Sequence, residues 1–269
     1  MTLVQKEPKY IKIWSTDAKK VYYGSNQVRP VLPITTAWIY RNPKDWIISM
    51  SSDWSTRYTI ADKNLWATEV YNNWDTLSQA NCWNFYQRWN NYWFPFTWAV
   101  NKSSTKVSAS WYWPWNYFSS DTFIMVSWTW DSSNNYNLRW YNGSVTNRQW
   151  PCPTWFHIPT QWEWQNILNV WTSLWRWSSS SWNWVKTYLK MPFAWYLAYN
   201  SWTQNNTWYS IGYWTSVWHK NNYSYSCSIS SNWFTYNNSA YAAWWFNIRP
   251  FKNEAVQPYS NWTVLYQPS

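Results

Sequence analysis

The amino-acid sequence predicts an α+β fold: a small antiparallel sheet, one or two helices packed against it, and long loops. Three observations support this class. An amphipathic helical pattern lies near residues 160–174, short alternating segments rich in β-forming residues follow it, and residues 81–150 are loop-like, with little periodicity. The length of 269 residues suits one large domain, or one domain with an extension.

The helix is the most clearly defined element. Thr160 followed by Glu163 is a capping-box pattern, which predicts that the helix begins there. Apolar side chains then recur at i, i+3, i+4, i+7 and i+10, as in a helix with one buried face; they are Trp164, Ile167, Leu168, Trp171 and Leu174. A second, short helix is expected over residues 185–190.

Short strands are expected in the last third of the chain. Five alternating segments rich in β-forming residues span 193–199, 209–219, 224–230, 234–238 and 245–251. The first part of the chain differs, because strand patterns there surround Gly24-Ser25 and cover residues 46–50. Residues 1–57 are therefore expected to form a β-rich extension or linker.

Glycine is scarce and tryptophan is abundant. The chain has 3 Gly and 34 Trp, whereas glycine normally makes up about 7% of residues. Many tryptophans stand where a turn calls for glycine, as in Asn183-Trp184, Asn232-Trp233 and Trp113-Pro114-Trp115. Some bacterial lineages read UGA as glycine, and a translation table that reads UGA as tryptophan would produce this pattern. We interpret most of these Trp letters as glycine; Asn232-Trp233 then becomes a two-residue hairpin turn.

Charge and hydropathy argue against two classes of partner. The formal net charge of +10 is shared equally between the first 63 residues and the remainder, and no basic run marks a nucleic-acid site. No apolar run of 18 residues is present, so no membrane span is expected. The first ten residues lack the apolar segment of a signal peptide.

The chemistry-bearing residues are few. Three cysteines leave two alternatives open, one bridge with a free thiol or three free thiols; they are Cys82, Cys152 and Cys227. No Cys-x-x-Cys motif occurs and there are two His, so we expect no metal site and no cofactor. The sequence suggests no pair of carboxylates for acid–base chemistry. We therefore expect no enzyme activity, and a packing or hydrogen-bonding role for His157.

Five motifs, in order along the chain, resemble the fibrobacter-type major paralogous domain. They are TIADKNLWATEVY, CPTWFHIPTQWEW, MPFAWYLAY, IGYWTSV and WFNIRPF, and the resemblance covers roughly Thr59 to Asn253. The resemblance implies a C-type-lectin-like domain over residues 58–253, preceded by the extension 1–57 and followed by a tail, 254–269. That fold is shared with formylglycine-generating enzymes and with the variable proteins of diversity-generating retroelements, so it does not by itself define a function.

The resemblance also divides the tryptophans into two groups. Family glycines align with Trp66, Trp155, Trp195 and Trp245, whereas family tryptophans align with Trp164 and Trp214. The family often has a cysteine after its last Val-Arg, where this chain has Pro250. With that partner absent, the resemblance makes Cys82 the candidate partner of Cys152.

Residues 209–241 are the candidate binding segment. Tyr, Ser and Asn make up 19 of these 33 residues, and Lys220 is the single formal charge. Antibody paratopes and retroelement-diversified proteins use this palette. The resemblance implies an unknown protein or glycan ligand, surface or extracellular location, and ligand contacts from Val217, Trp218, His219, Asn221, Asn222, Tyr223, Tyr225, Cys227, Tyr236, Asn238 and Ala240.

Three other interpretations remain open. The segment can be a solvated sheet face with no dedicated partner. Tryptophans taken literally would make a carbohydrate-binding module, in which exposed indoles stack on sugar rings. An enzyme similar to formylglycine-generating enzymes would need a cysteine-based redox or copper site, which Cys227 alone does not supply.

Overall fold

The computed structural model is composed mainly of antiparallel sheets, with three helices among the residues that it describes. This composition is compatible with a small α+β or β-rich fold. The described residues are 21–23, 26–28, 38–51, 56–73, 75–82, 84–87, 93–94, 101–103, 122–124, 148, 151–174, 181–193, 196–197, 204–205, 210–220, 223–230, 234–241, 244–256, 258 and 261–266.

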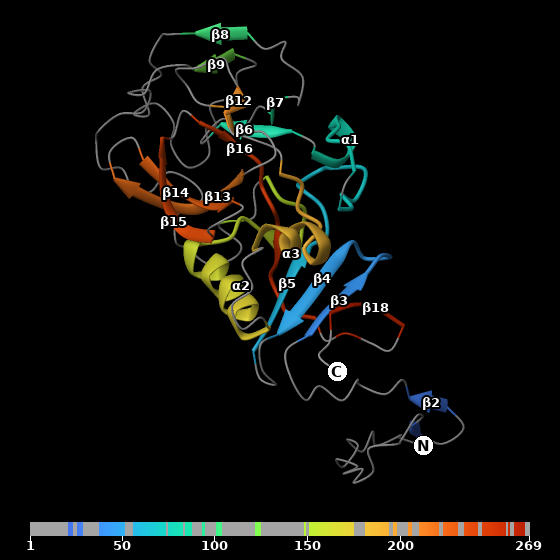
Figure 1. Ribbon diagram of the computed structural model, residues 1–269. Coiled ribbons are helices and arrows are strands. Elements are labelled where there is room, and N and C mark those ends of the chain that lie inside the picture. The colour runs from blue at the N-terminus through green and yellow to red at the C-terminus, as the bar shows by residue number, and fades with distance from the viewer. Residues whose placement is uncertain are drawn as a thin grey trace, which may run out of the picture.

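The largest sheet has six antiparallel strands and joins both ends of the chain. Its spatial order is β10 (Phe156–His157), β17 (Phe251–Lys252), β5 (Arg57–Ala61), β4 (Ile47–Ser51), β3 (Trp38–Asn42) and β18 (Thr263–Tyr266). Strands β3 and β4 are therefore integral to the main sheet, as is β18 from the tail. Residue 57 does not separate a β-rich extension from the body, and this corrects the expected boundary. Figure 1 shows strands β3, β4 and β5 of this sheet in blue, with red β18 at its edge.

The candidate binding segment forms a separate three-stranded antiparallel sheet. Its order is β13 (Ser210–Lys220), β14 (Tyr223–Ser230) and β15 (Phe234–Tyr241). The β13–β14 register shifts between Trp214 and Lys220, and the β14–β15 register shifts between Ser226 and Ser228. The expected hairpin between β14 and β15 is confirmed by their pairing, whereas its turn, Asn232-Trp233, lies outside the described residues.

The remaining strands are short. A five-stranded antiparallel sheet has the order β12 (Gln204–Asn205), β11 (Tyr196–Leu197), β16 (Trp245–Phe246), β6 (Phe85–Gln87) and β7 (Trp93–Phe94). Strands β8 (Asn101–Ser103) and β9 (Thr122–Ile124) form a parallel pair. Strands β1 (Val21–Tyr23) and β2 (Asn26–Val28) pair antiparallel, which confirms the two strands expected on either side of Gly24-Ser25; the turn itself lies outside the described residues.

The helices are α1 (Gln79–Cys82), α2 (Gln161–Leu174) and α3 (Ser181–Tyr188). The capping box of α2 is confirmed, because the Glu163 amide donates to Thr160 Oγ1 at 3.1 Å and the Thr160 amide donates to the Glu163 carboxylate at 2.7 Å. The expected turn at Asn183-Trp184 is wrong. Both residues lie inside α3, where Trp184 is buried in the core.

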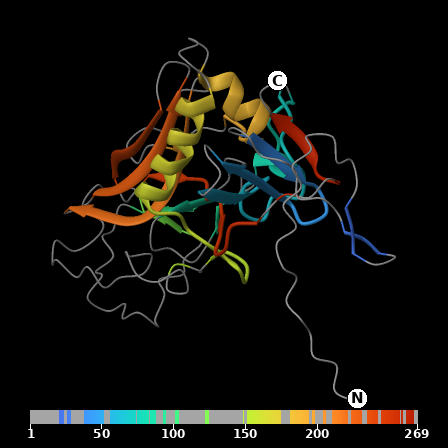
Figure 2. The same ribbon diagram turned by 90° about the horizontal axis from the view of Figure 1, so that it is seen from below.

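Helix α2 lies against the three-stranded sheet (Figures 1 and 2), which it contacts along all three strands. The helix buries Trp164 and Ile167 in the main core. Trp164 stacks on Tyr213 of β13, with ring centroids 5.3 Å apart, and meets Phe251 of β17 edge-on at 5.1 Å. One indole therefore connects the helix to both sheets.

A second core cluster lies on the other side of β13. It contains Trp214, Phe246 and Ala240. The Trp214 indole N–H donates to the Tyr86 carbonyl at 2.6 Å, and its ring meets Phe246 edge-on at 4.7 Å. The three-stranded sheet is thus held between two clusters, so that only part of it remains exposed.

Candidate functional site

The exposed part of the three-stranded sheet carries aromatic side chains from neighbouring strands. On β14, partly exposed Tyr223 and Tyr225 alternate with the buried residues Ser224 and Ser226. Strand geometry places the tyrosines on one face and the serines on the other. His219 of β13 lies beside Tyr225, with a ring-centroid distance of 4.5 Å.

The serines and a threonine bind the backbone beneath this face. Ser224 Oγ donates to the Val217 carbonyl at 3.3 Å, and Ser226 Oγ donates to the Asn238 carbonyl at 3.2 Å. Thr215 Oγ1 donates to the Tyr225 carbonyl at 2.8 Å. These bonds satisfy buried hydroxyls and fix the strands that carry the tyrosines.

Tyr236 of β15 extends the aromatic surface towards α2. Its ring centroid lies 6.2 Å from that of Trp162 in the first turn of the helix, and it also packs against the main core. Asn238 of the same strand donates from Nδ2 to Ser228 Oγ at 3.2 Å. We name the partly exposed set His219, Tyr223, Tyr225 and Tyr236 the tyrosine face. The expected contact residue Asn238 is in register with Ser226, so it lies on the side of the buried serines and is left out as a correction.

Three expected contact residues are buried, so we leave them out of the tyrosine face as a correction. Cys227 is completely buried in the main core, in register with Tyr213. Ala240 is completely buried in the second cluster, in register with Ser224, and Val217 is 9% exposed. Trp218 lies on β13, where it pairs with Ser224 of β14. Asn221 and Asn222 lie outside the described residues.

Ser239 lies beside the tyrosine face and is not one of the contact residues expected from the sequence. Ser239 is exposed and in register with Tyr225, so a partner that contacts Tyr225 also meets a hydroxyl. The Tyr, Ser and Asn composition was the available signal, but it applied to the whole segment. Composition alone does not distinguish exposed serines from the buried serines of β14.

His157 belongs to a polar network at the start of α2. Its Nε2 lies 2.8 Å from Glu163 Oε1, its Nδ1 lies 2.9 Å from Asn253 Oδ1, and Arg148 Nη1 donates to Glu163 Oε2 at 2.6 Å. Burial would raise the pKa of Glu163, but the hydrogen bonds and charges of His157 and Arg148 lower it to about 2. The expected hydrogen-bonding role of His157 is confirmed.

All three cysteines are free and buried. The Cys82–Cys152 bridge suggested by the family resemblance is therefore wrong, and the alternative of three free thiols holds. Burial raises the pKa of Cys82 to about 12 and raises the pKa of Cys152 and Cys227 well above the usual value. Such thiols are poor nucleophiles at neutral pH, because the thiolate is the reactive form.

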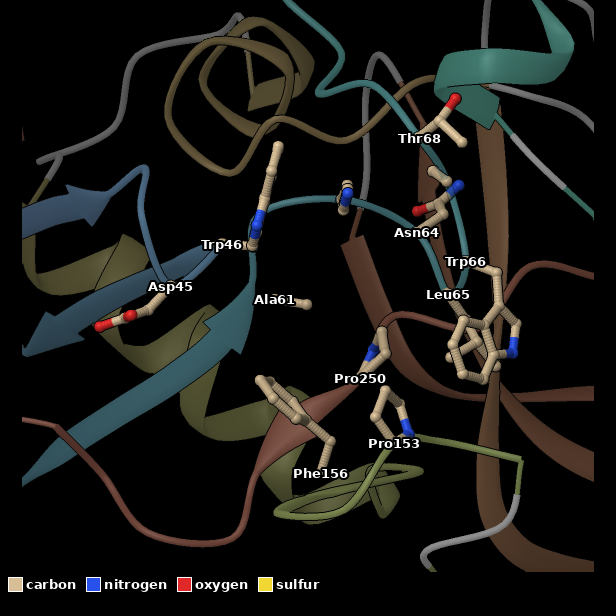
Figure 3. A pocket seen from close by; sticks show the side chains of 12 residues that line it. Asp45, Trp46, Ala61, Asn64, Leu65, Trp66, Thr68, Pro153, Phe156 and Pro250 are labelled. Atoms are coloured by element: carbon tan, nitrogen blue, oxygen red, sulfur yellow. The ribbon is translucent and has the colours of Figure 1, made fainter.

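A pocket of about 460 Å³ lies where four segments converge, at the β3–β4 turn, after β5, before β10 and before β17. Figure 3 shows Trp46 and Trp66 on opposite sides of it, with Pro250 between them in this view. Phe156 and Leu65 add apolar walls, and the Lys63 ammonium lies 3.7 Å from the centre of the Trp46 ring. The sequence does not predict this pocket, because no single segment contains its walls.

The arrangement of metal-ligating side chains and the length of the helices bear on cofactors and partners. Among the described residues, no group of three or more His, Cys, Asp or Glu side chains lies close enough together to hold a metal ion. In the same part of the chain, no helix is long and apolar enough to cross a membrane. Comparisons of the chain with protein-family models, with curated proteins and with solved structures yield no match.

Proposed function

We propose that this protein is a non-enzymatic binding protein, displayed at the cell surface or outside the cell, that contacts a protein or glycan through the tyrosine face. The observation that carries the proposal is the pair Tyr223 and Tyr225, partly exposed above two buried, hydrogen-bonded serines. The scaffold is proposed to be C-type-lectin-like, on the basis of the motif resemblance. The antiparallel three-stranded sheet with α2 against it is compatible with that fold.

The chemistry of the face favours binding through contact area and hydrogen bonds. Tyrosine supplies a large ring with a polar tip and has few side-chain torsions to immobilise, so it loses little entropy on binding. His219 adds a second ring against Tyr225, and Ser239 adds a hydroxyl opposite it. Charged groups are absent from the tyrosine face itself, which matches a partner recognised by shape and hydrogen bonding rather than by charge.

The same palette supports the proposal that the face is diversified by a retroelement. Adenine-directed mutation of asparagine codons yields Asn, Tyr, Ser, His, Asp, Gly and Cys. All of these except Asp and Gly occur between His219 and Asn238. A near-identical template repeat close to the gene, differing only at adenines, is the expected genomic signature. A gene without such a repeat would contradict diversification and leave the binding proposal standing.

The binding proposal is tested by selecting a ligand and then mutating the face. The full chain would be screened against a random peptide library and a glycan array, and the tightest peptide or glycan would serve as the probe. The variant Tyr223→Ala/Tyr225→Ala should weaken its affinity at least tenfold, because clustered aromatic anchors carry most interface energy. Tyr266→Ala, on the edge strand β18, is the control and should bind normally. Equal affinities for all three proteins would overturn the assignment.

The alternative is a carbohydrate-binding module that stacks sugars on exposed indoles. Trp46, Trp66 and Trp155 are each substantially exposed, which such a platform requires. It predicts glycan binding that survives Tyr223→Ala/Tyr225→Ala but is lost when these three tryptophans are replaced. The same three residues, however, have positive φ angles, which favour glycine over tryptophan at these positions.

A further inference from the structure

Among the described residues, four other than glycine have a positive φ angle, and three of them are tryptophans. The φ angles are 57° at Trp46, 64° at Trp66 and 71° at Trp155; the fourth is Lys190, at 54°, just after α3. Glycine adopts this left-handed region freely, whereas it is strained for bulky side chains. Each of the three tryptophans lies in a turn that backbone hydrogen bonds hold in place.

Trp155 occupies the third position of a four-residue turn. The Phe156 amide donates to the Pro153 carbonyl at 3.0 Å, which closes the turn over residues 153–156. A positive φ at the third position is the mark of a type II turn, and that position requires glycine or asparagine. The Trp155 carbonyl also accepts from the Asn253 amide at 2.8 Å, so the turn is held to β17 and cannot relax independently.

Trp66 repeats this arrangement. The Ala67 amide donates to the Asn64 carbonyl at 2.9 Å, which again places the positive φ at the third position of the turn. The turn is held on its other side as well, because the Leu65 amide donates to the Ile248 carbonyl at 2.9 Å. The backbone conformation at residue 66 therefore favours glycine for the same reason as at residue 155.

Trp46 is the last residue of the four-residue loop between β3 and β4. Asn42 and Ile47 pair across the base of that loop, and Asn42 Oδ1 accepts from the Lys44 amide at 3.0 Å. The Trp46 carbonyl accepts from the Asp62 amide at 2.9 Å. These bonds fix the loop, and its final residue must turn through the left-handed region to enter β4.

The three indole side chains are too exposed for their burial to offset the backbone strain. They are 44%, 52% and 65% exposed at Trp46, Trp66 and Trp155. Trp164 and Trp214, by contrast, are completely buried and have no positive φ, and Trp214 uses its indole N–H. Backbone conformation and burial thus distinguish Trp46, Trp66 and Trp155 from Trp164 and Trp214, independently of any motif.

We propose that residues 46, 66 and 155 are glycine in the protein that the cell makes, and that the pocket between their turns is bounded there by bare backbone. Trp46 and Trp66 line this pocket, as do Pro153 and Phe156, which begin and end the third turn. With glycine at residue 46, the Lys63 ammonium loses its aromatic partner. The pocket is then wider than the indoles allow, and it contains no aromatic platform at these three positions.

Two other tryptophans stand on backbone that does not require glycine. Trp245, which the family resemblance aligned with glycine, has no positive φ and stacks on Phe94 with centroids 4.5 Å apart. Trp162 is exposed, but it lies on ordinary helical backbone. The proposal is limited to the three turn positions, where the backbone itself requires glycine.

Peptide sequencing by tandem mass spectrometry tests the residue identities directly. The protein would be purified from the cells that naturally make it and digested with trypsin. Cleavage after Arg148 and Arg176 gives one peptide that contains both residue 155 and residue 164. Glycine at 155 with tryptophan at 164 in the same peptide is the expected result, together with glycine at 46 and 66. Tryptophan at any of the three turn positions would overturn the proposal.

A recombinant comparison tests the physical reason. The triple variant Trp46→Gly/Trp66→Gly/Trp155→Gly should raise Tm above that of the chain with tryptophan, by roughly 2 °C or more for each position. The matched control is Trp214→Gly, which leaves a cavity in the second core cluster and should lower Tm. A triple variant that melts below the starting chain would show that the indoles are required there.

Discussion

The Glu163 carboxylate lies 2.8 Å from Nε2 of His157 and joins the first turn of α2 to β10. The same carboxylate accepts from the guanidinium of Arg148 and caps its own helix through Thr160. Asn253, next to β17, lies on the other nitrogen of the histidine ring. One partly buried carboxylate therefore connects a helix that packs against the three-stranded sheet with the edge of the six-stranded sheet.

Glu163→Gln should destabilise the fold by about 2 kcal/mol at pH 7, because it leaves the buried Arg148 guanidinium without its counter-charge. Glutamine preserves the capping box, so the loss isolates the charge. Urea unfolding followed by fluorescence measures it. Glu69→Gln, at an exposed carboxylate, is the control and should be neutral. If both variants unfold at the same urea concentration, the network makes no net contribution.

The stability should also fall in acid in a defined window. The pKa of Glu163 is lowered in the folded protein from 4.5 to about 2. The ionised carboxylate therefore contributes stability that is present above about pH 4.5 and is lost as the pH falls towards 2. Urea midpoints measured between pH 7 and pH 2 should drop more steeply for the natural residue than for Glu163→Gln. Parallel profiles would contradict the lowered pKa.

The three thiols should resist alkylation until the protein unfolds. Burial raises the pKa of each of them, and all are inaccessible in the fold. Treatment with iodoacetamide at pH 8 should leave Cys82, Cys152 and Cys227 unmodified, whereas treatment in guanidinium without a reductant should modify all three. Intact mass gives the count. A single alkylated cysteine in guanidinium would instead indicate a disulfide between the other two.

Local patterns predicted the local elements well. The capping box and apolar period predicted α2, because both signals lie within the helix itself. Strand alternation predicted β13 and β14 for the same reason. The six-stranded sheet was not predicted, since its pairings join distant segments: β5 pairs with β17, and β3 pairs with β18. Nothing within residues 38–42 indicates that one of their partner strands lies near the end of the chain.

The candidate site was predicted in part, for a related reason. Alternation along β14 places Tyr223, Tyr225 and Cys227 on one face, but it does not indicate how far α2 extends over that face. Cys227 lies in the main core, in the same cluster as Trp164, whereas the two tyrosines are partly exposed. The pocket beside Lys63 draws on four segments, so it could not be read from any one of them.

Gly212→Ala should destabilise the protein by about 1–3 kcal/mol, because the added methyl group would overpack a site that is already filled. A Cβ at residue 212 would lie 2.1 Å from the Phe246 ring, which is completely buried and held by Trp214. Urea unfolding of Gly212→Ala, Phe246→Leu and the double variant gives the coupling. The double variant should be more stable than the sum of the single effects predicts. Strict additivity would mean that Phe246 is not the obstacle.

Arg249→Met should be more damaging than Arg249→Lys. The guanidinium is completely buried, and it donates to the Ala61 carbonyl at 3.1 Å and to the Lys190 carbonyl at 2.8 Å. Methionine fills similar space but leaves both carbonyls without this donor, which should cost about 3 kcal/mol or more. Lysine keeps a charge and reaches one carbonyl, so its cost should be smaller. The two hydrogen bonds of Arg249 link β5 to the residues after α3. Amide hydrogen exchange should therefore become faster in β5 and in the residues after α3 of Arg249→Met. Unchanged exchange protection in these two segments would show that packing alone holds them together.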